Sequence, residues 1–355
     1  MSNIILGNKI KLYRNIDSKK FVKSMTDDEL KENLEFLDPI IRELGYEKID
    51  IENMSSLRKL KFVEEGRLSK KFVEKNNIGF YQKVDEPDIL LNSSEHIELS
   101  KFSRSKSLDE LYEEIYDLEG KLEDKIDFAF NPDYGYLTSR VFNAGTGFKP
   151  ITFMYLPALN YFGINEIARG LSRLGYTLGS YRDKSKKALA SIYTLSFEST
   201  LTEDEKSYVE KLKLITDEIA DVEMENRKKL YLDNIISLED MVNRSYGLLA
   251  NARLLSEEEM MQSMSMINLG IELSILKANR DFDFYKEIMK LRNGHLQIER
   301  GSILDLKSRD ILRANKSRAL MKEVFKWVCL VDLVKNHKKP FSLLNKKQEN
   351  KNIHI

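Results

Sequence analysis

The sequence predicts a globular chain that mixes strands and helices before Ser199 and is helical after it. Three observations predict this. Short apolar runs that stop at turn residues, such as residues 4–14 and 89–91, are typical of strands. From residue 199 onward, apolar side chains recur at helical spacing. The chain has 355 residues, 42% of them apolar, which is enough for two domains with cores of their own.

Composition and charge exclude several classes of protein. The 57 basic and 57 acidic residues cancel, so nothing favours non-specific binding of nucleic acid or of an acidic membrane. The single cysteine, Cys329, excludes an intramolecular disulfide framework and a cysteine zinc cluster, and we predict no metal ligands. The N-terminus lacks a signal-peptide pattern and no apolar run could span a bilayer, so we expect a cytoplasmic protein.

Local patterns set the expected elements. Pro39 suggests a break or restart in the first helix, and Gly175 ends another. Ser237, three residues before Asp240, predicts a helix start. The methionine-rich segment 260–276 is more typical of a core or dimer interface than of a cofactor site. Strands are predicted at residues 4–14, 89–91, 127–130, 134–141 and 151–156, and helices at residues 26–44, 55–75, 107–122, 165–174, 199–232 and 237–259.

The most informative stretch joins three of these strands and contains a small-residue loop, Asn143-Ala144-Gly145-Thr146-Gly147. Two glycines and a threonine between strands let the backbone approach a ligand, as in loops that hold phosphates through N–H groups. A glycine-containing hairpin with no ligand is the alternative on these five residues alone.

Residues 137–149 resemble the active-site segment of the ATP:guanido phosphotransferases, which comprise the phosphagen kinases and the bacterial protein arginine kinases. Asn143, Gly145, Thr146 and Gly147 match that segment. The family's cysteine, proline and nucleotide-contacting arginine are replaced by Arg140, Val141 and Lys149. The frame of the segment is kept, while the residues that carry its chemistry are changed.

The first strand continues this resemblance. Lys9 and Lys11 occupy positions where the family's arginines grip nucleotide phosphates, and they share one face of the strand because Ile10 lies between them. Lysine keeps the charge but loses the planar fork that fits a phosphate. The alternative is an ordinary edge strand with solvated lysines.

In residues 92–98 the family has two glutamates that orient the guanidinium substrate and help to take its proton. Asn92 and His96 match the family pattern, Ser93 and Ser94 replace the glutamates, and Glu98 replaces a phosphate-binding arginine. Glu95 is the candidate substitute carboxylate. His96 is a nucleotide-site residue by resemblance, whereas a lone histidine is more often a structural one.

A later loop corresponds to the family's second catalytic glutamate. Gly179 matches, Leu178 replaces another phosphate arginine, and Asp183 stands at the glutamate position. The surrounding basic residues, from Arg182 to Lys187, are either a solvated loop or a site for an anion other than ATP.

Residues 238–253 resemble the protein arginine kinases in particular. Arg309, Asp310 and Arg313 then match a motif that in those kinases forms a phosphoarginine pocket. Two guanidinium groups four residues apart on a helix suit a dianionic phosphoryl group, and Asp310 suits the ligand's guanidino group. An exposed helix with an internal salt bridge is the alternative.

The resemblance implies an α+β fold with a phosphagen-kinase-like curved antiparallel sheet flanked by helices, and an all-helical C-terminal domain. The expected divisions are a catalytic-like domain at residues 1–226, a helical dimerisation and phosphoarginine-binding domain at 227–335, and a disordered tail at 336–355.

Two functions follow. One is a catalytically impaired relative of the protein arginine kinases that binds phosphoarginine, client or partner proteins in protein quality control. The other is an active kinase that uses ATP and Mg²⁺, with Asp183 and Glu95 as carboxylates and lysines as phosphate clamps. By resemblance the partners are a Clp unfoldase, a heat-shock repressor or zinc-finger activator protein, arginine-phosphorylated proteins, and a second copy in a homodimer. An impaired relative needs no cofactor.

Overall fold

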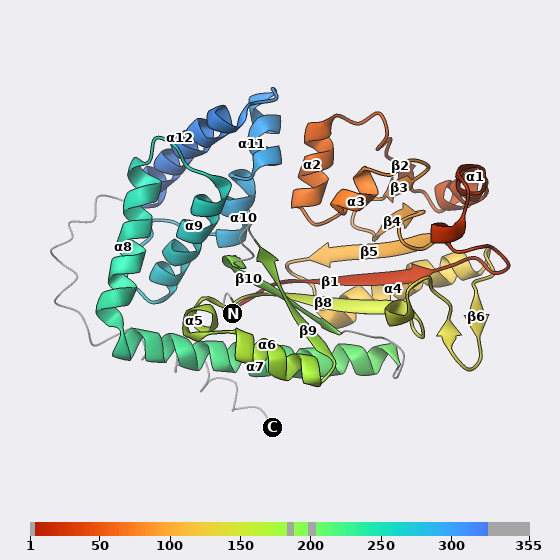
Figure 1. Cartoon of the computed structure of the whole chain (residues 1–355), viewed down its shortest axis with the longest axis horizontal. Helices are drawn as coiled ribbons and strands as arrows, with labels where there is room; N and C mark the ends of the chain where they lie inside the picture. Colours follow the sequence, from red (N-terminus) through yellow and green to blue (C-terminus); the bar gives the residue numbers. More distant parts are fainter. Residues whose placement is uncertain (1–3, 183–187, 198–203, 326–355) are drawn as a thin grey trace. The chain divides into compact units, whose positions relative to one another are not determined.

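The computed structural model describes residues 4–182, 188–197 and 204–325. The chain forms two compact units, Met1–Glu225 and Asn226–Ile355 (Figure 1). The first unit combines one large sheet with helices, and the described residues of the second are helical. The predicted α+β class is therefore confirmed. Cys329 and the predicted tail, residues 336–355, lie outside the described residues.

The sheet of the first unit has eight strands in the order β2-β3-β4-β5-β1-β8-β10-β9, and every neighbouring pair is antiparallel. A separate hairpin pairs β6 (Phe130–Asn131) with β7 (Gly135–Tyr136). The strands of the large sheet are β1 (Ile5–Arg14), β2 (Glu47–Lys48), β3 (Gly79–Gln82), β4 (Asp88–Leu91), β5 (Ile97–Ser103), β8 (Phe148–Tyr155), β9 (Tyr176–Arg182) and β10 (Ala188–Phe197).

The alternation of side chains along β1 assigns its two faces. Ile10 and Leu12 are fully buried in the main core, which they share with Leu111 and Ile115 of helix α4. Figure 1 shows α4 lying along the sheet where β1 and β5 run, and both strands contact it. Lys9 and Lys11 therefore project to the opposite face.

Helices surround this sheet. Helix α1 begins with a capping box between Thr26 and Glu29 and runs unbroken through Pro39, which removes only the hydrogen bond that its own amide would donate. The expected break at Pro39 does not occur. The helices of this unit are α1 (Asp27–Glu43), α2 (Ser56–Glu64), α3 (Lys70–Val73), α4 (Leu108–Glu123), α5 (Pro157–Phe162), α6 (Asn165–Arg173) and α7 (Glu205–Asp233), of which α7 runs on into the second unit.

Two predicted elements are shorter than expected. The helix predicted at residues 55–75 is interrupted, because Gly66 adopts a positive φ of 69° and ends the helical path between α2 and α3. The strand predicted at residues 134–141 contains only β7, and a 3₁₀ turn, Val141–Asn143, follows it. This turn brings the chain into the glycine loop.

The second unit contains five further helices among its described residues. Helix α8 packs against α9 and α12. Ser237 does not cap α8, which begins at Ile235 after Asn234, while Ser256 forms a capping box with Glu259 at the start of α9. The methionine-rich segment is core. The helices are α8 (Ile235–Asn251), α9 (Glu257–Glu272), α10 (Phe284–Lys290), α11 (Asn293–Arg300) and α12 (Leu306–Val324).

Across the described parts of the chain, none of the helices combines the length and the apolar character needed to cross a bilayer.

Candidate functional site

The lysine face is the side of the large sheet that carries Lys9 and Lys11. Strand β1 lies between β5 and β8, so the alternative of an edge strand is wrong. Lys11 lies opposite Ser100 on β5 and opposite Lys149 on β8. Cross-strand partners project to the same face. The sheet therefore gathers Lys9, Lys11 and Lys149, three of the predicted phosphate-binding residues, on one surface.

Lys11 is already paired with an internal acid. Its Nζ lies 2.6 Å from Oε1 of Glu98, whose other oxygen accepts a hydrogen bond from Ser93 at 2.9 Å. Burial acts against the charge on Lys11, but Glu98 more than offsets it, so the Lys11 pKa lies above its ordinary value. Burial raises the Glu98 pKa, but the charge of Lys11 and its hydrogen bond outweigh burial and leave the Glu98 pKa below its usual range. Both groups are charged at neutral pH, and the carboxylate neutralises the charge that Lys11 would offer to an anion.

Lys9 contacts the protein instead of an open site. Only 5% of it is exposed, and its Nζ donates to the backbone oxygen of Gly66 at 2.5 Å, in the turn between α2 and α3. Burial, followed by the charge of Lys11, lowers the pKa of Lys9 to about 7. This amine contributes only part of a positive charge at neutral pH.

Lys149 and Arg140 differ from these two lysines. Lys149 is half-buried and Arg140 is exposed, and within the described chain neither side chain has a hydrogen bond or an ion pair. Burial lowers the pKa of Lys149, and the charges of Lys11 and Arg140 lower it further. Arg140 stands directly before the 3₁₀ turn that leads to the glycine loop. These two cations are available to an external anion.

Glu95, the predicted substitute carboxylate, is completely buried. One of its oxygens accepts hydrogen bonds from Nδ2 of Asn15 at 2.8 Å and from the backbone N–H of Ser139 at 2.9 Å. The other accepts from Oγ of Ser139 at 2.7 Å. The carboxylate thus ties residue 139 to the end of β1. The geometry gives it a structural role, and a catalytic role for Glu95 stays a prediction.

His96 is also enclosed. The backbone N–H of Ile16 donates to its Nδ1 at 3.0 Å, and its Nε2 lies 2.8 Å from the backbone oxygen of Lys20. These contacts need a neutral ring with the proton on Nε2. Burial lowers the His96 pKa to about 4, in keeping with this tautomer. The contacts favour the structural alternative over nucleotide binding.

The glycine loop is fixed by hydrogen bonds that its backbone carbonyl groups accept. The backbone oxygens of Gly145 and Gly147 accept from the N–H groups of Tyr136 and Tyr13, at 2.7 and 2.9 Å. Gly147 has a φ of 63°, and a Cβ there would lie 2.5 Å from the backbone oxygen of Tyr13. Only glycine permits this close approach. Asn143, in the preceding turn, and Thr146, between the two glycines, belong to the same loop.

The structure adds a residue to which the sequence analysis gave no role. Arg14 is buried at the end of β1, bonds Oε1 of Glu119 at 2.5 Å and stacks 3.4 Å above the ring of Tyr136. Its Nη1 donates to the backbone oxygen of Thr146 at 2.8 Å. Arg14 therefore positions the glycine loop. The sequence signals for Arg14 are its place at the end of the first strand and its match to the family pattern there.

The remaining predicted residues of this unit lie in or after β9. Gly179 pairs with Thr194 of β10, and a Cβ at Gly179 would lie 2.9 Å from the Thr194 hydroxyl. Leu178 packs against the main core, so the family's arginine position is apolar here. Asp183 and the basic residues 184–187 lie outside the described residues.

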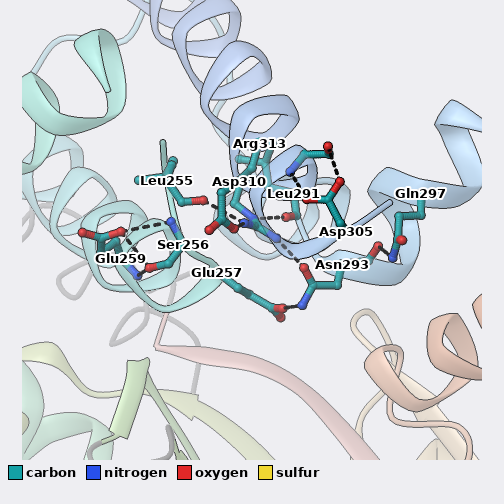
Figure 2. A network of polar contacts seen from close by, with 11 residues as sticks. Leu255, Ser256, Glu257, Glu259, Leu291, Asn293, Gln297, Asp305, Asp310 and Arg313 are labelled. Atoms are coloured by element: carbon teal, nitrogen blue, oxygen red, sulfur yellow. Dashed lines mark hydrogen bonds and ion pairs between the residues drawn. The ribbon is translucent and has the colours of Figure 1, made fainter. Parts of the chain in front are cut away.

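In the second unit, Arg313 lies at the centre of a polar network (Figure 2). It is completely buried, and its guanidinium donates to the backbone oxygens of Leu255 and Leu291, at 2.7 and 2.9 Å. It also bonds Asp310 at 2.8 Å and the side chain of Asn293. Internal acceptors thus surround the group that was predicted to hold a phosphoryl group.

Arg309, one helical turn earlier, lies in different surroundings. Its side chain is half-buried, and its Nε is shielded from solvent without a hydrogen-bond partner among the described residues. The predicted phosphoarginine site of Arg309, Asp310 and Arg313 stays a prediction. The contacts make Arg309 its most available donor.

Two family models match consecutive parts of the chain. The ATP:guanido phosphotransferase C-terminal catalytic domain matches residues 28–227, and the protein-arginine kinase McsB C-terminal domain matches residues 235–328.

Solved phosphagen kinases share the fold. The duplicated taurocyamine kinase from Schistosoma mansoni, solved with transition-state analogue components, superposes with a TM-score of 0.58 at 15% identity, covering 70% of this chain and 39% of that chain. Lombricine kinase superposes with a TM-score of 0.53 at 15% identity, covering 62% and 66%. This chain therefore matches well under half of the first structure and about two thirds of the second. The fold is that of the phosphagen kinases.

Sequence relatives narrow this class. The protein-arginine kinase of Bacillus licheniformis is 31% identical over 330 residues, which cover 90% of this chain and 91% of the relative. That of Halalkalibacterium halodurans is 30% identical, with 90% and 92% covered. The chain belongs to the protein-arginine kinase family, within the ATP:guanido phosphotransferases.

Proposed function

We propose that this protein is a catalytically impaired member of its family that acts by binding arginine-phosphorylated, client or partner proteins in protein quality control. One observation carries the proposal. Both carboxylates of the segment that supplies the family's substrate acids are used internally, Glu95 by Asn15 and Ser139 and Glu98 by Lys11. Neither is left to orient a guanidinium group or to take its proton.

The expected loss of rate is large. Removing a general base alone costs roughly a hundredfold to ten-thousandfold. Phosphoryl transfer otherwise depends on positioning and on neutralising charge, which preorganised donors supply. Removing one such donor costs roughly 3 to 4 kcal/mol. Here the charge of Lys11 is neutralised by Glu98, Lys9 donates its hydrogen bond to the backbone of Gly66, and Leu178 carries no charge.

The residues fit a magnesium–ATP complex poorly. Lys149 and Arg140 are two cations without an internal partner among the described residues, and two positive charges do not balance a triphosphate. Among the described residues no group of three or more histidine, cysteine, aspartate or glutamate side chains could hold a metal ion. Magnesium would have to arrive on the nucleotide, with the phosphates and bound waters as its ligands.

A binding role finds support in the second unit. The buried, unpartnered Nε of Arg309 suits an anionic ligand better than solvent, since an unsatisfied buried donor is costly. The relatives are called protein-arginine kinases, so arginine-bearing proteins are the natural partners. The proposal includes the division of roles between residues 1–226 and 227–335, a homodimer, and a cytoplasmic location. A Clp unfoldase, a heat-shock repressor and a zinc-finger activator protein are its candidate partners.

The test combines binding with turnover. Magnesium–ATP is titrated into the full chain by calorimetry, and the chain is incubated with an arginine-rich protein and radiolabelled ATP, with the Bacillus licheniformis kinase in parallel. We expect no acid-labile phosphoarginine above background. Phosphoarginine formation at a rate near that of the parallel enzyme would reject the proposal.

The second function is an active protein-arginine kinase with a rearranged site. Identity of 31% over 90% of the chain to a protein of that name favours it. Asp183 would then be the carboxylate and Lys149 a phosphate clamp. In that case Asp183→Asn should abolish the turnover measured above, while Asp133→Asn, an exposed change in the β6–β7 turn, should not.

A further inference from the structure

The cationic patch consists of Lys11, Lys75, Arg140 and Lys149 on the lysine face and its edge. Strand register places Lys149 directly opposite Lys11. Lys75, two residues after the end of α3, donates to the backbone oxygens of Asn92 and Ser93, and among the described residues it has no carboxylate partner. Contacts of neighbouring residues bring these cations together. Ser139, next to Arg140, donates to the backbone oxygen of Ser94, beside the Ser93 oxygen that Lys75 contacts. The Ser93 hydroxyl in turn donates to Glu98, the partner of Lys11.

Few acids balance this patch. Glu98 neutralises Lys11, and Glu95 is buried beneath Ser139 with three internal hydrogen bonds. Lys149 and Arg140 have no counter-ion within the described chain. Like charges held together without an acid repel one another, and a bound anion relieves that repulsion.

An apolar surface adjoins the patch. Val141 and Phe142, which follow Arg140 directly, are 70% and 68% exposed. The turn that carries them leads into Gly145, which is hydrogen-bonded to Tyr136 of the β6–β7 hairpin. Two large exposed apolar side chains that directly follow an unpaired, exposed arginine are typical of a surface that binds a partner.

We propose that Arg140 and Lys149 bind the phosphomonoester group of a phosphorylated protein segment, and that Val141 and Phe142 receive an apolar side chain next to it. This deepens the proposed function, because it names a second binding site and its ligand class. A phosphomonoester carries up to two negative charges and three acceptor oxygens, which two cations can satisfy.

Charge and shape separate this ligand from the family's own. A nucleotide triphosphate carries more negative charge than these two cations neutralise. Phosphoarginine would need a carboxylate for its guanidino nitrogens, and Glu95 and Glu98 are both occupied. A phosphoserine, phosphothreonine or phosphotyrosine side chain has no such requirement. The exposed apolar pair suits a peptide, because a peptide has an apolar side chain to contact it and a free phosphate ion has none.

The experiment measures fluorescence anisotropy of labelled peptides with the full chain. The probe carries phosphoserine beside phenylalanine. Three otherwise identical peptides, called its twins, each carry one change: unphosphorylated serine, phosphoarginine in place of phosphoserine, or alanine in place of phenylalanine. We expect the probe to bind at least tenfold more tightly than the serine and phosphoarginine twins. Equal affinity for the probe and its serine twin would overturn the proposal.

Variants locate the site. Arg140→Ala and Lys149→Ala should each weaken probe binding about tenfold, and Arg140→Lys should recover part of the loss. Phe142→Ser should weaken binding of the probe but not of the alanine twin. The control is Arg169→Ala, an exposed arginine on α6 with a long ion pair to Glu166 at 3.9 Å. Unchanged binding in both cation variants would overturn the proposal.

Two further measurements distinguish this phosphopeptide site from the proposed function of the whole protein. Arg309→Ala should leave probe binding unchanged, because that residue belongs to the predicted site of the second unit. Magnesium–ATP should displace the probe only at concentrations far above the peptide's own Kd. Efficient displacement by nucleotide would show a nucleotide site and overturn the inference. Turnover of ATP would instead reject the proposed function, whatever the peptides do.

Discussion

Arg313 in the second unit and Arg140 in the first carry the same charged group in opposite surroundings. Arg313 is completely buried and donates to four acceptors supplied by the fold, whereas Arg140 is exposed and has none within the described chain. A guanidinium group surrounded by protein acceptors serves stability, and one without them is available to a ligand. The same contrast separates Lys11, paired with Glu98, from Lys149.

The largest expected effect is at Arg313. Arg313→Ala should lower the free energy of unfolding by about 3–5 kcal/mol, because it leaves Asp310 and two backbone carbonyls without their donor. Chemical denaturation followed by circular dichroism measures the change. The control is Arg244→Ala. The Arg244 side chain is 80% exposed and lies 2.9 Å from Asp240, so this change should lower the free energy of unfolding by less than about 1 kcal/mol. Equal losses in both variants would contradict the assignment.

Glu95 sharpens the contrast within the first unit. If it is structural, Glu95→Ala should cost about 2 kcal/mol of stability, because the donors of Asn15 and Ser139 lose a charged acceptor. Glu113→Ala, at an exposed position on α4, should change little and serves as the control. A fully stable Glu95→Ala variant would show that the carboxylate is not needed by the fold, and would revive the catalytic assignment.

Lys9 gives a pH dependence. Its pKa is about 7 in the folded chain, while an unfolded lysine titrates near 10.4, so the unfolded state binds more protons between these values. The destabilising effect of Lys9 is therefore complete below about pH 7 and disappears as the pH rises toward 10.4. The free energy of unfolding of the wild-type chain should therefore rise through the contribution of Lys9 as the pH increases from about 7 to about 10.4.

Lys9→Met tests this directly. It should remove that gain and stabilise the protein at pH 7 by on the order of 1 kcal/mol, since an apolar side chain of similar length has no charge to desolvate. Denaturation at pH 7 and pH 9 measures both effects, with exposed Lys23→Met as the control. A loss of stability at both pH values would show that the bond to Gly66 outweighs the burial of the amine.

Local sequence patterns predicted the features that depend on neighbouring residues, namely strand faces and helices. Alternation along β1 placed Lys9 and Lys11 on one face, and the helix at residues 26–44 was expected from its own sequence. The roles of the charged groups were not predictable in this way. Glu98 meets Lys11 from 87 residues away, and Glu95 meets Ser139 from 44 residues away. Which acid is used internally depends on strand register, and a single sequence does not specify that register.

Local rules also failed where two signals competed. Ser237 resembles a helix cap, but the chain is already helical from Ile235, so the residue lies inside the first turn of α8. Pro39 suggests a helix end, but α1 loses only one hydrogen bond there and continues. In both cases the helix includes the residue that was expected to mark its boundary.

The smallest expected effect on stability is at Arg140, and it completes the contrast with Arg313. Arg140→Ala should change the free energy of unfolding by less than about 0.5 kcal/mol, because the described fold supplies no acceptor that would lose its donor. The same denaturation experiment measures it beside Arg313→Ala. A loss above about 1 kcal/mol would mean that Arg140 has an internal partner, and it would then no longer be available to an external anion. A neutral result for stability, together with a loss of phosphopeptide binding, is the combination that distinguishes a ligand-binding arginine from a structural one.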